Sequence, residues 1–256
     1  MLVLRSFLYN ILFFGIGISF AVALLPVLVF PRSVLQKGLK LWAWVILRGL
    51  KPLAGLTWQV KGLENLPDEP CIFACKHQSA WETGAFYLLV NDPAYILKQE
   101  LLSIPFFGWH LRRSGAISID RKAGASALKK MISGTKERIA RGQNVVIFPE
   151  GTRAHPGKPG TYHPGIAALY RGTDAPVIPV ALNSGLFWQR RSFLKRPGCI
   201  TIEFLPAMEQ GLDRKAFMKD LQDRMETTTN LLIEDARANC PQALPALEPS
   251  ENDVSG

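Results

Sequence analysis

The sequence has few of the residues from which metal sites, disulfide frameworks and covalent-catalysis sites are built. Its 256 residues include four cysteines and four histidines. No C-x-x-C pair is present, and no histidine has H-E-x-x-H or Cys-His ligand spacing, which argues against a disulfide framework and a zinc site. A G-x-S-x-G nucleophile elbow is also absent. We therefore expect reduced cysteines, no zinc site and no serine nucleophile of this kind.

Acidic residues are absent from the first 63 positions, and Glu64 is the first of them. The same stretch holds seven basic residues, so it supplies seven of the nine net positive charges of the chain. The remaining residues are nearly balanced in charge. This placement argues against a nucleic-acid partner and indicates an anionic membrane surface. The chain is 48% hydrophobic, which excludes disorder as its main state.

The longest uncharged run extends from Ser6 to Pro31. A helix of this length exceeds the ~30 Å hydrocarbon core of a bilayer. A secretory signal is the alternative, because Ala21-Val22-Ala23 resembles a small-residue cleavage site. The apolar run continues to Phe30, however, which makes it longer than the usual ~7–15-residue signal core. We interpret it as an uncleaved transmembrane helix over about 6–31.

A second apolar segment, about 34–50, contains Trp42 and Trp44 and is flanked by basic residues. This pattern is typical of a helix in the membrane interface, and an ordinary buried helix is the alternative. The basic residues that follow the first segment predict that the bulk of the chain lies on the cytoplasmic face, where it meets anionic lipid headgroups. We thus expect a membrane anchor over 1–54, a folded domain over 55–238 and a disordered tail over 239–256.

Short apolar runs alternate with helical patterns after residue 54. This alternation predicts an α/β fold, with a mixed central sheet covered by helices. The expected strands are 57–60, 72–75, 94–97, 116–119, 145–148, 177–182 and 200–205. The expected helices are 81–90, 123–141, 164–171 and 214–238.

His77 and Glu82 follow the second expected strand. They are five residues apart, about 140° around a helix, so they can meet only if His77 lies in the turn before the helix. Ser79 and Glu82 form a capping-box pattern that would start the helix at Ala80. Capping alone would explain Ser79 and Glu82, so a functional interpretation requires a second feature.

Three further strand ends carry charged residues. Glu150, Gly151, Thr152 and Arg153 follow the strand at 145–148, while Arg121 and Lys98 follow two others. Loops at strand carboxyl ends commonly contact ligands in α/β sheets, and an arginine fork suits phosphate. A general base beside phosphate-seeking cations is a coherent site.

In this order and spacing, the blocks resemble those of the 1-acyl-glycerol-3-phosphate acyltransferases, in the glycerolipid acyltransferase superfamily. The H-x-x-x-x-D block matches His77 to Glu82, G-x-I-x-I-D-R matches 115–121, F-P-E-G-T-R matches 148–153, and V-I-P-V matches 177–180. Two departures stand out. Glu82 replaces the usual Asp, which makes this an H-x4-E variant, and Tyr162-His163 stands where relatives often have Phe-Lys.

The resemblance implies a direct transfer of a fatty acyl group from acyl-CoA or acyl carrier protein to the sn-2 hydroxyl of a lysophosphatidate. It also implies that no metal or cofactor is required, and that the protein lies at a bacterial inner membrane. His77 would be the general base and Glu82 would orient it. Glu150, Gly151 and Thr152 would support the loop and the oxyanion. Lys98, Arg121 and Arg153 would bind the substrate phosphate. Acylation of another lysolipid, such as a lyso-ornithine lipid, and lipid binding without turnover are the alternatives.

Overall fold

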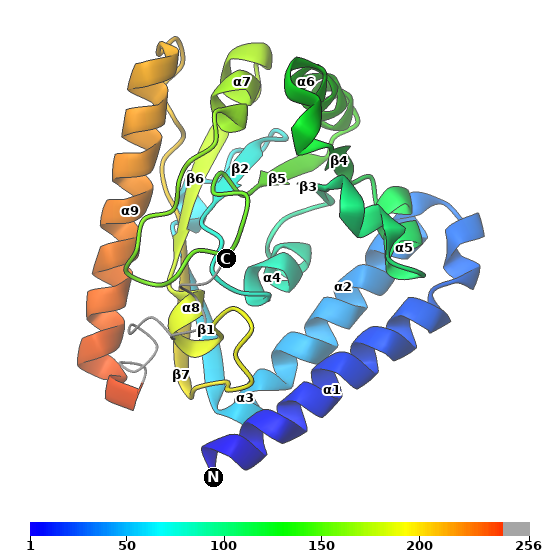
Figure 1. Ribbon diagram of the computed structural model, residues 1–256, viewed down its shortest axis with the longest axis vertical. Helices are drawn as coiled ribbons and strands as arrows, with labels where there is room; N and C mark the ends of the chain where they lie inside the picture. Colours follow the sequence, from blue (N-terminus) through cyan, green and yellow to red (C-terminus); the bar gives the residue numbers. More distant parts are fainter. Residues whose placement is uncertain (243–256) are drawn as a thin grey trace.

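A seven-stranded sheet forms the centre of the computed structural model, which describes residues 1–242 (Figure 1). The strand order is β1-β7-β6-β2-β5-β3-β4, and neighbouring strands are parallel except for the antiparallel pair β6 and β7. The strands are β1 Leu56–Lys61, β2 Ile72–Cys75, β3 Pro93–Lys98, β4 Ile117–Ile119, β5 Asn144–Ile147, β6 Val177–Leu182 and β7 Gly198–Phe204. The predicted α/β class with a mixed sheet is confirmed.

Helices cover both faces of this sheet (Figure 1). The sequence predicted α4, α6, α7 and α9 to within two residues, whereas the short helices α3, α5 and α8 were not predicted. The helices are α1 Leu2–Ala23, α2 Arg32–Arg48, α3 Leu50–Ala54, α4 Trp81–Leu89, α5 Phe107–Arg113, α6 Gly124–Ala140, α7 Gly165–Gly172, α8 Ser184–Phe187 and α9 Arg214–Asn239. The predicted tail begins where α9 ends, and residues 243–256 lie outside the described part of the chain.

Each central strand sends its side chains alternately into two apolar cores. In β2, Phe73 and Cys75 belong to the core that contains α2 and α4, whereas Ile72 and Ala74 belong to the core that contains α6 and α7. This is the period of two that places successive strand residues on opposite faces. Both faces are covered, so the strand is apolar at every position.

The N-terminal apolar run forms a helix and a turn. Helix α1 ends at Ala23, the segment Pro26–Val29 is a 3-10 turn, and α2 begins at Arg32. The continuous helix expected over 6–31 is therefore shorter. Pro26 and Pro31 lack the backbone N–H that a continuing helix would use. Helix α1 is the single helix among the described residues that is long and apolar enough to cross a membrane.

One side of α1 is fixed to the rest of the molecule by polar contacts. The Tyr9 hydroxyl donates to the Ile46 carbonyl of α2 at 3.1 Å, and Asn10 Nδ2 donates to the Phe193 carbonyl at 2.9 Å. Ser6 bonds to both the backbone N–H and the carbonyl of Lys195, in the loop between α8 and β7. Helix α1 thus lies along the rest of the molecule, beside α2 (Figure 1).

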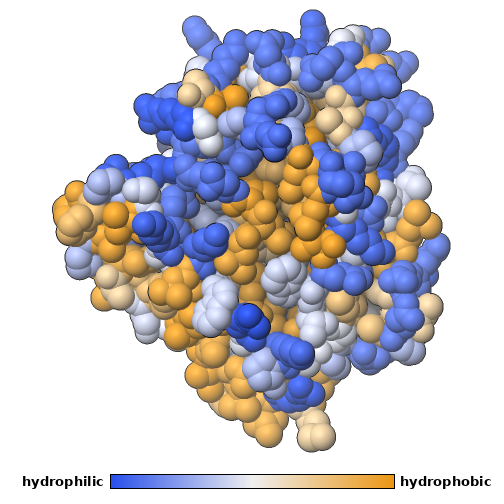
Figure 2. Space-filling view, turned by 180° about the vertical axis from the view of Figure 1, so that it is seen from behind, coloured by the Kyte–Doolittle hydropathy of each residue, from blue (hydrophilic) through white to orange (hydrophobic). Residues whose placement is uncertain are grey.

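The opposite side of α1 is exposed and apolar. Further exposed aromatic residues lie on α2 and at the start of α5, where Phe106, Phe107 and Trp109 are each more than 40% exposed. Viewed from behind, hydrophobic residues dominate the lower part of the molecule, which holds α1, and hydrophilic residues dominate the upper part (Figure 2). An exposed apolar patch that extends over several neighbouring residues of one helix marks an interaction surface, whereas single exposed apolar residues do not. The exposed residues of α1 include Val3, Leu4, Phe7, Leu8, Ile11, Phe14, Ile18 and Val22.

Candidate active site

The residues predicted for the site follow four neighbouring parallel strands. His77 follows β2, Glu150 follows β5, Lys98 ends β3, and Arg121 follows β4. These strands are adjacent in the order β2-β5-β3-β4, so their carboxyl ends lie at one edge of the sheet. Strand β6 is parallel to β2 on its other side and adds residues 183 and 184 to the same edge.

His77 lies in the turn between β2 and α4, and its ring is bonded to Glu82. His77 Nδ1 is 2.8 Å from Glu82 Oε1. Helix α4 begins at Trp81, one residue after the predicted start, with Glu82 in its first turn. The predicted capping interaction is also present, since Ser79 N donates to Glu82 and Ser79 Oγ accepts from Trp81 N. Capping and the His–Glu pair therefore use the same carboxylate.

Glu82 is fully buried and accepts five hydrogen bonds. Oε1 accepts from the His77 ring and from the backbone N–H groups of Gln78 and Ser79, at 2.7–2.8 Å. Oε2 accepts from the hydroxyls of Ser79 and Ser184, at 3.0 and 2.9 Å. Burial alone would raise the pKa of Glu82, but the bonds and charge of His77 and the backbone donors keep this pKa below its usual value. The carboxylate is thus held ionised.

Ser184 was not predicted from the sequence. It lies 102 positions from Glu82, at the start of the four-residue helix α8, and nothing in the local sequence pairs the two. The neighbouring residue Gly185 donates its backbone N–H to Gln78 Oε1 at 3.1 Å. Helix α8 therefore supports the turn that carries His77.

His77 is held on three sides besides its bond to Glu82. Its backbone N–H donates to Glu150 Oε2 at 3.0 Å, and its carbonyl accepts from Ala154 N at 2.7 Å. Its ring stacks on Phe148, with centroids 4.0 Å apart. The side chain is 14% exposed, and Nδ1 is used by Glu82, so Nε2 is the ring nitrogen left for a substrate. A neutral imidazole fixed in this way can act as a general base.

Glu150 belongs to a buried charge network. Lys76 Nζ donates to Glu150 at 2.6 Å and to Glu226 of α9 at 2.5 Å, and Lys76 is 1% exposed. Tyr162 donates to the same Glu226 oxygen at 3.0 Å. Burial raises the pKa of Glu150 in spite of the opposing effect of Lys76. Glu150 thus positions the His77 backbone, and the sequence did not reveal Lys76 or Glu226 because their partners are distant in the chain.

Gly151 adopts a left-handed conformation, with φ of 63°, and its carbonyl accepts from Arg121 Nη2 at 2.7 Å. Its backbone N–H donates to the Phe148 carbonyl at 2.9 Å. Oxyanion donors were expected among the backbone N–H groups around Gly151, and that of Gly151 itself is engaged within the turn. The N–H groups of Thr152 and Arg153 have no hydrogen-bond partner within residues 1–242 and are the available donors of this loop.

The three cations predicted to bind phosphate have different surroundings. Lys98 and Arg121 are exposed, and Lys98 pairs with Ile119 at the β4 side of the site. Arg153 is half-buried, and its pKa is lowered by burial and by repulsion from Arg190, against the attraction of Glu82. Arg153 directly precedes Ala154, whose N–H bonds to the His77 carbonyl, whereas Arg121 bonds to the Gly151 carbonyl.

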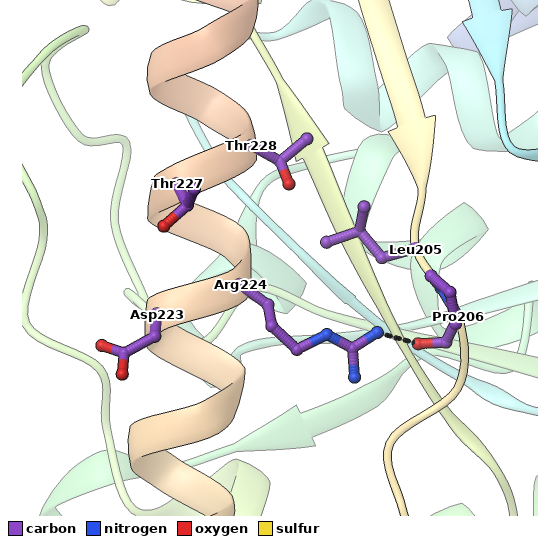
Figure 3. Close-up of a pocket in the computed structure, with 6 residues that line it drawn as sticks. All are labelled: Leu205, Pro206, Asp223, Arg224, Thr227 and Thr228. Carbon is purple, nitrogen blue, oxygen red and sulfur yellow. Dashed lines mark hydrogen bonds between the residues drawn. The ribbon is translucent and has the colours of Figure 1, made fainter.

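A cavity of about 310 Å³ lies elsewhere, between α9 and the segment after β7 (Figure 3). Arg224 crosses it to bond the Pro206 carbonyl. This segment runs beside Val177 and Pro179 at the start of β6, whereas the candidate site follows the end of β6. The cavity and the site thus lie at opposite edges of the sheet.

Comparisons with known proteins agree with this geometry. Residues 57–183 match the Acyltransferase family model. The 1-acyl-sn-glycerol-3-phosphate acyltransferase of Pseudomonas aeruginosa is 36% identical over 210 residues, covering 82% of this chain and 80% of its own. The Saccharomyces cerevisiae protein of the same name is 26% identical over 70% of this chain and 62% of its own. The crystal structure of 1-acyl-sn-glycerophosphate acyltransferase PlsC from Thermotoga maritima shares the fold, with a TM-score of 0.73, 21% identity and coverage of 91% and 99%.

A histidine bonded to a buried carboxylate is present on this fold, and the family match and the relatives define the class of protein as an O-acyltransferase. The match to the Pseudomonas aeruginosa protein covers 210 residues, so it extends beyond residues 57–183, which match the family model. The chain belongs to the family of 1-acyl-sn-glycerol-3-phosphate acyltransferases.

Proposed function

We propose that this enzyme moves a fatty acyl group from an acyl thioester to the free sn-2 hydroxyl of 1-acyl-glycerol-3-phosphate, which yields phosphatidate. The observation that carries the proposal is the His77–Glu82 pair, with Nε2 of His77 available at the edge of the sheet where cations gather. The donor is an acyl thioester of coenzyme A or of acyl carrier protein.

The reaction is a direct transfer. His77 Nε2 accepts the proton of the acceptor hydroxyl as its oxygen attacks the thioester carbon. Glu82 accepts from Nδ1, fixes the tautomer and stabilises the imidazolium that forms. The N–H groups of Thr152 and Arg153 stabilise the negative charge on the thioester oxygen. When the carbon–sulfur bond breaks, the thiolate takes the proton back from the imidazolium.

Cations at the strand ends would hold the phosphate of the acceptor. Arg153 directly precedes Ala154, whose N–H donates to the His77 carbonyl at 2.7 Å. Arg121 and Lys98 lie on the β4 side and extend the positive surface. A guanidinium fork matches phosphate in geometry and charge, and each charged hydrogen bond contributes about 1.5–3 kcal/mol.

The membrane is the source of the acceptor and receives the product. The exposed apolar side of α1 and the aromatic residues at the start of α5 support membrane association. Lys37 and Lys40 of α2 border a groove of about 390 Å³ and could meet anionic headgroups, whereas Arg32 is paired with Asp92. We propose that the protein lies at a bacterial inner membrane, with the site on the cytoplasmic face where acyl thioesters are made.

The test is acyl transfer by the purified full-length protein in detergent micelles, with labelled acyl-CoA and a panel of lysolipids. We expect transfer to lysophosphatidate in preference to lyso-ornithine lipid and neutral lysolipids. His77→Ala should lower turnover by about 10²–10⁴-fold, because it removes the general base. His163→Ala is the matched control, since His163 is exposed and belongs to the same region. A folded His77→Ala protein with near-normal turnover would refute the assignment.

A further inference from the structure

The loop between α8 and β7, residues 188–197, carries positive charge next to the site. Arg190, Arg191, Lys195 and Arg196 lie in it, and no acidic residue occurs from Gly185 to Gly198. This loop was not among the predicted site segments. Gln189 Nε2 is 2.9 Å from His155 Nε2, which lies two residues after Arg153. The side-chain contact brings the loop against the segment that carries Arg153.

Both ends of this contact are anchored to the catalytic turn. Ala154, between Arg153 and His155, donates its N–H to the His77 carbonyl at 2.7 Å. Helix α8, which precedes the loop, bonds to Glu82 through Ser184 and to Gln78 through Gly185. The position of Arg190 relative to His77 is therefore set by hydrogen bonds on both sides, rather than by a free loop.

Arg153 and Arg190 are two cations without an anion. Within residues 1–242, neither guanidinium has a hydrogen-bond or ion-pair partner. The Gln189–His155 contact places Arg190 beside the segment that carries Arg153, and after burial, repulsion from Arg190 contributes to the lowered pKa of Arg153, against the attraction of Glu82. Arg190 is exposed and Arg153 is half-buried, and an anion bound to both guanidinium groups would offset the repulsion between them.

The backbone of the loop is also strained at this point. Ser192 N donates to the Gln189 carbonyl at 3.2 Å, so Arg190 and Arg191 are the central residues of a β-turn. Arg191 has φ of 58°, a conformation that glycine or asparagine adopts more readily. Backbone strain of this kind persists only where the surrounding structure holds the residue in place, and strained residues cluster at ligand-binding sites.

We propose that Arg190 and Arg153 together bind the phosphomonoester of the acceptor, on the α8 side of His77. The inference rests on the proposed function. Four covalent bonds join the sn-2 oxygen to the phosphorus, so the phosphate lies within about 5 Å of the hydroxyl that His77 must reach. The phosphates of a coenzyme A or carrier-protein donor are separated from the thioester by the whole pantetheine arm. A phosphomonoester carries a charge of about −1.5 to −2 near neutral pH, which suits two guanidinium groups.

The test compares Arg190→Ala with Arg191→Asn in the full-length enzyme. The control removes the same charge from the neighbouring position, with a residue type that tolerates the positive φ. Initial rates are measured with lysophosphatidate and with monoacylglycerol as acceptors, and with acyl-CoA and acyl-N-acetylcysteamine as donors. We expect Arg190→Ala to raise the KM for lysophosphatidate about tenfold or more, with the KM values for monoacylglycerol and both donors unchanged.

Three other outcomes would overturn the assignment. A raised KM for acyl-CoA alone would indicate that Arg190 binds the phosphates of the donor. An equal effect of Arg190→Ala and Arg191→Asn would indicate that Arg190 acts only through the general surface charge of the loop. If neither substitution had an effect, Arg190 would not bind the phosphate. Thermal unfolding of each variant checks that the fold is intact.

A double-mutant cycle gives a second readout. If Arg153 and Arg190 hold one phosphate, their effects on the KM for lysophosphatidate will be non-additive, whereas independent sites would add. The wild-type acceptor panel tests the proposed function separately. Wild-type transfer to lysophosphatidate with a normal Arg190→Ala variant would refute this inference alone, and absence of wild-type transfer would refute the proposed function.

Discussion

The carboxylate of Glu82 can be tested for charge and for reach with two substitutions. Glu82→Gln keeps the size of the side chain and removes the charge. The five groups around the carboxylate all donate, so an amide NH2 would face a donor instead of an acceptor. The ring of His77 would lose the acceptor that fixes its tautomer, and we expect kcat to fall by about 10²–10⁴-fold.

Glu82→Asp keeps the charge and removes one methylene, which withdraws the carboxylate by about 1.5 Å. The 2.8 Å contact with His77 would lengthen to roughly 4 Å if the backbone stayed in place, and this is no longer a hydrogen bond. Loss of one bond to a charged group costs about 1.5–3 kcal/mol, so kcat should fall about 10- to 150-fold.

Both variants are assayed for kcat at saturating substrates, with thermal unfolding as the check on folding. We expect kcat to decrease in the order wild type, Glu82→Asp, Glu82→Gln. Ser184→Ala, which removes one donor from Oε2 and leaves the bond to His77, should have the smallest effect. Native-like Glu82→Gln with more than half of the wild-type kcat would refute a role for the charge. Wild-type kcat in Glu82→Asp would show that the backbone, rather than side-chain length, sets the distance.

Three further substitutions test the framework around the site. Lys76→Met leaves the buried Glu150 and the partly buried Glu226 without their cation and should destabilise the protein by about 3–5 kcal/mol in chemical denaturation; an unchanged midpoint would contradict the network. Burial lowers the pKa of Lys195 to about 8. Between pH 8 and 10.5 this lysine is therefore protonated in the unfolded chain and neutral in the native protein. The free energy of unfolding should rise with pH in this range, by roughly 1–3 kcal/mol. Lys195→Met should remove this rise, and a slope unchanged in the variant would refute its origin. Gly62→Ala places a Cβ 1.9 Å from the Phe204 carbonyl oxygen at a φ of 73°, and should lower the free energy of unfolding by more than about 2 kcal/mol; a native melting temperature would count against the crowding.

Local sequence patterns were enough to predict the strands of the sheet and much of the turn that carries His77. β2 and β6 were predicted with their observed bounds, because strands covered on both faces are apolar at every position. The meeting of His77 with Glu82 followed from the capping pattern around Ser79, since a helix that starts after the histidine leaves it free to turn back.

Contacts between distant segments were beyond local patterns. Lys76 reads as a strand-end lysine that should be exposed, and its two carboxylate partners lie 74 and 150 positions away. Hydropathy predicted a helix past Ala23 because it measures apolar character and not backbone donors, which the prolines remove. Helix α8 is four residues long, too short to show a helical period, so Ser184 gave no signal.

The polar contacts of α1 bear on how this enzyme can be simplified. A shortened protein that begins after residue 24, designed to dissolve without detergent, would lose Ser6, Tyr9 and Asn10. Lys195, a buried cation, would lose its Asn10 acceptor, and Trp188 would lose the Tyr9 ring packed edge-on at 5.4 Å. The loop of residues 188–197 would then be free on its α1 side. Detergent or nanodisc handling of the whole chain therefore preserves what a water-soluble fragment would discard.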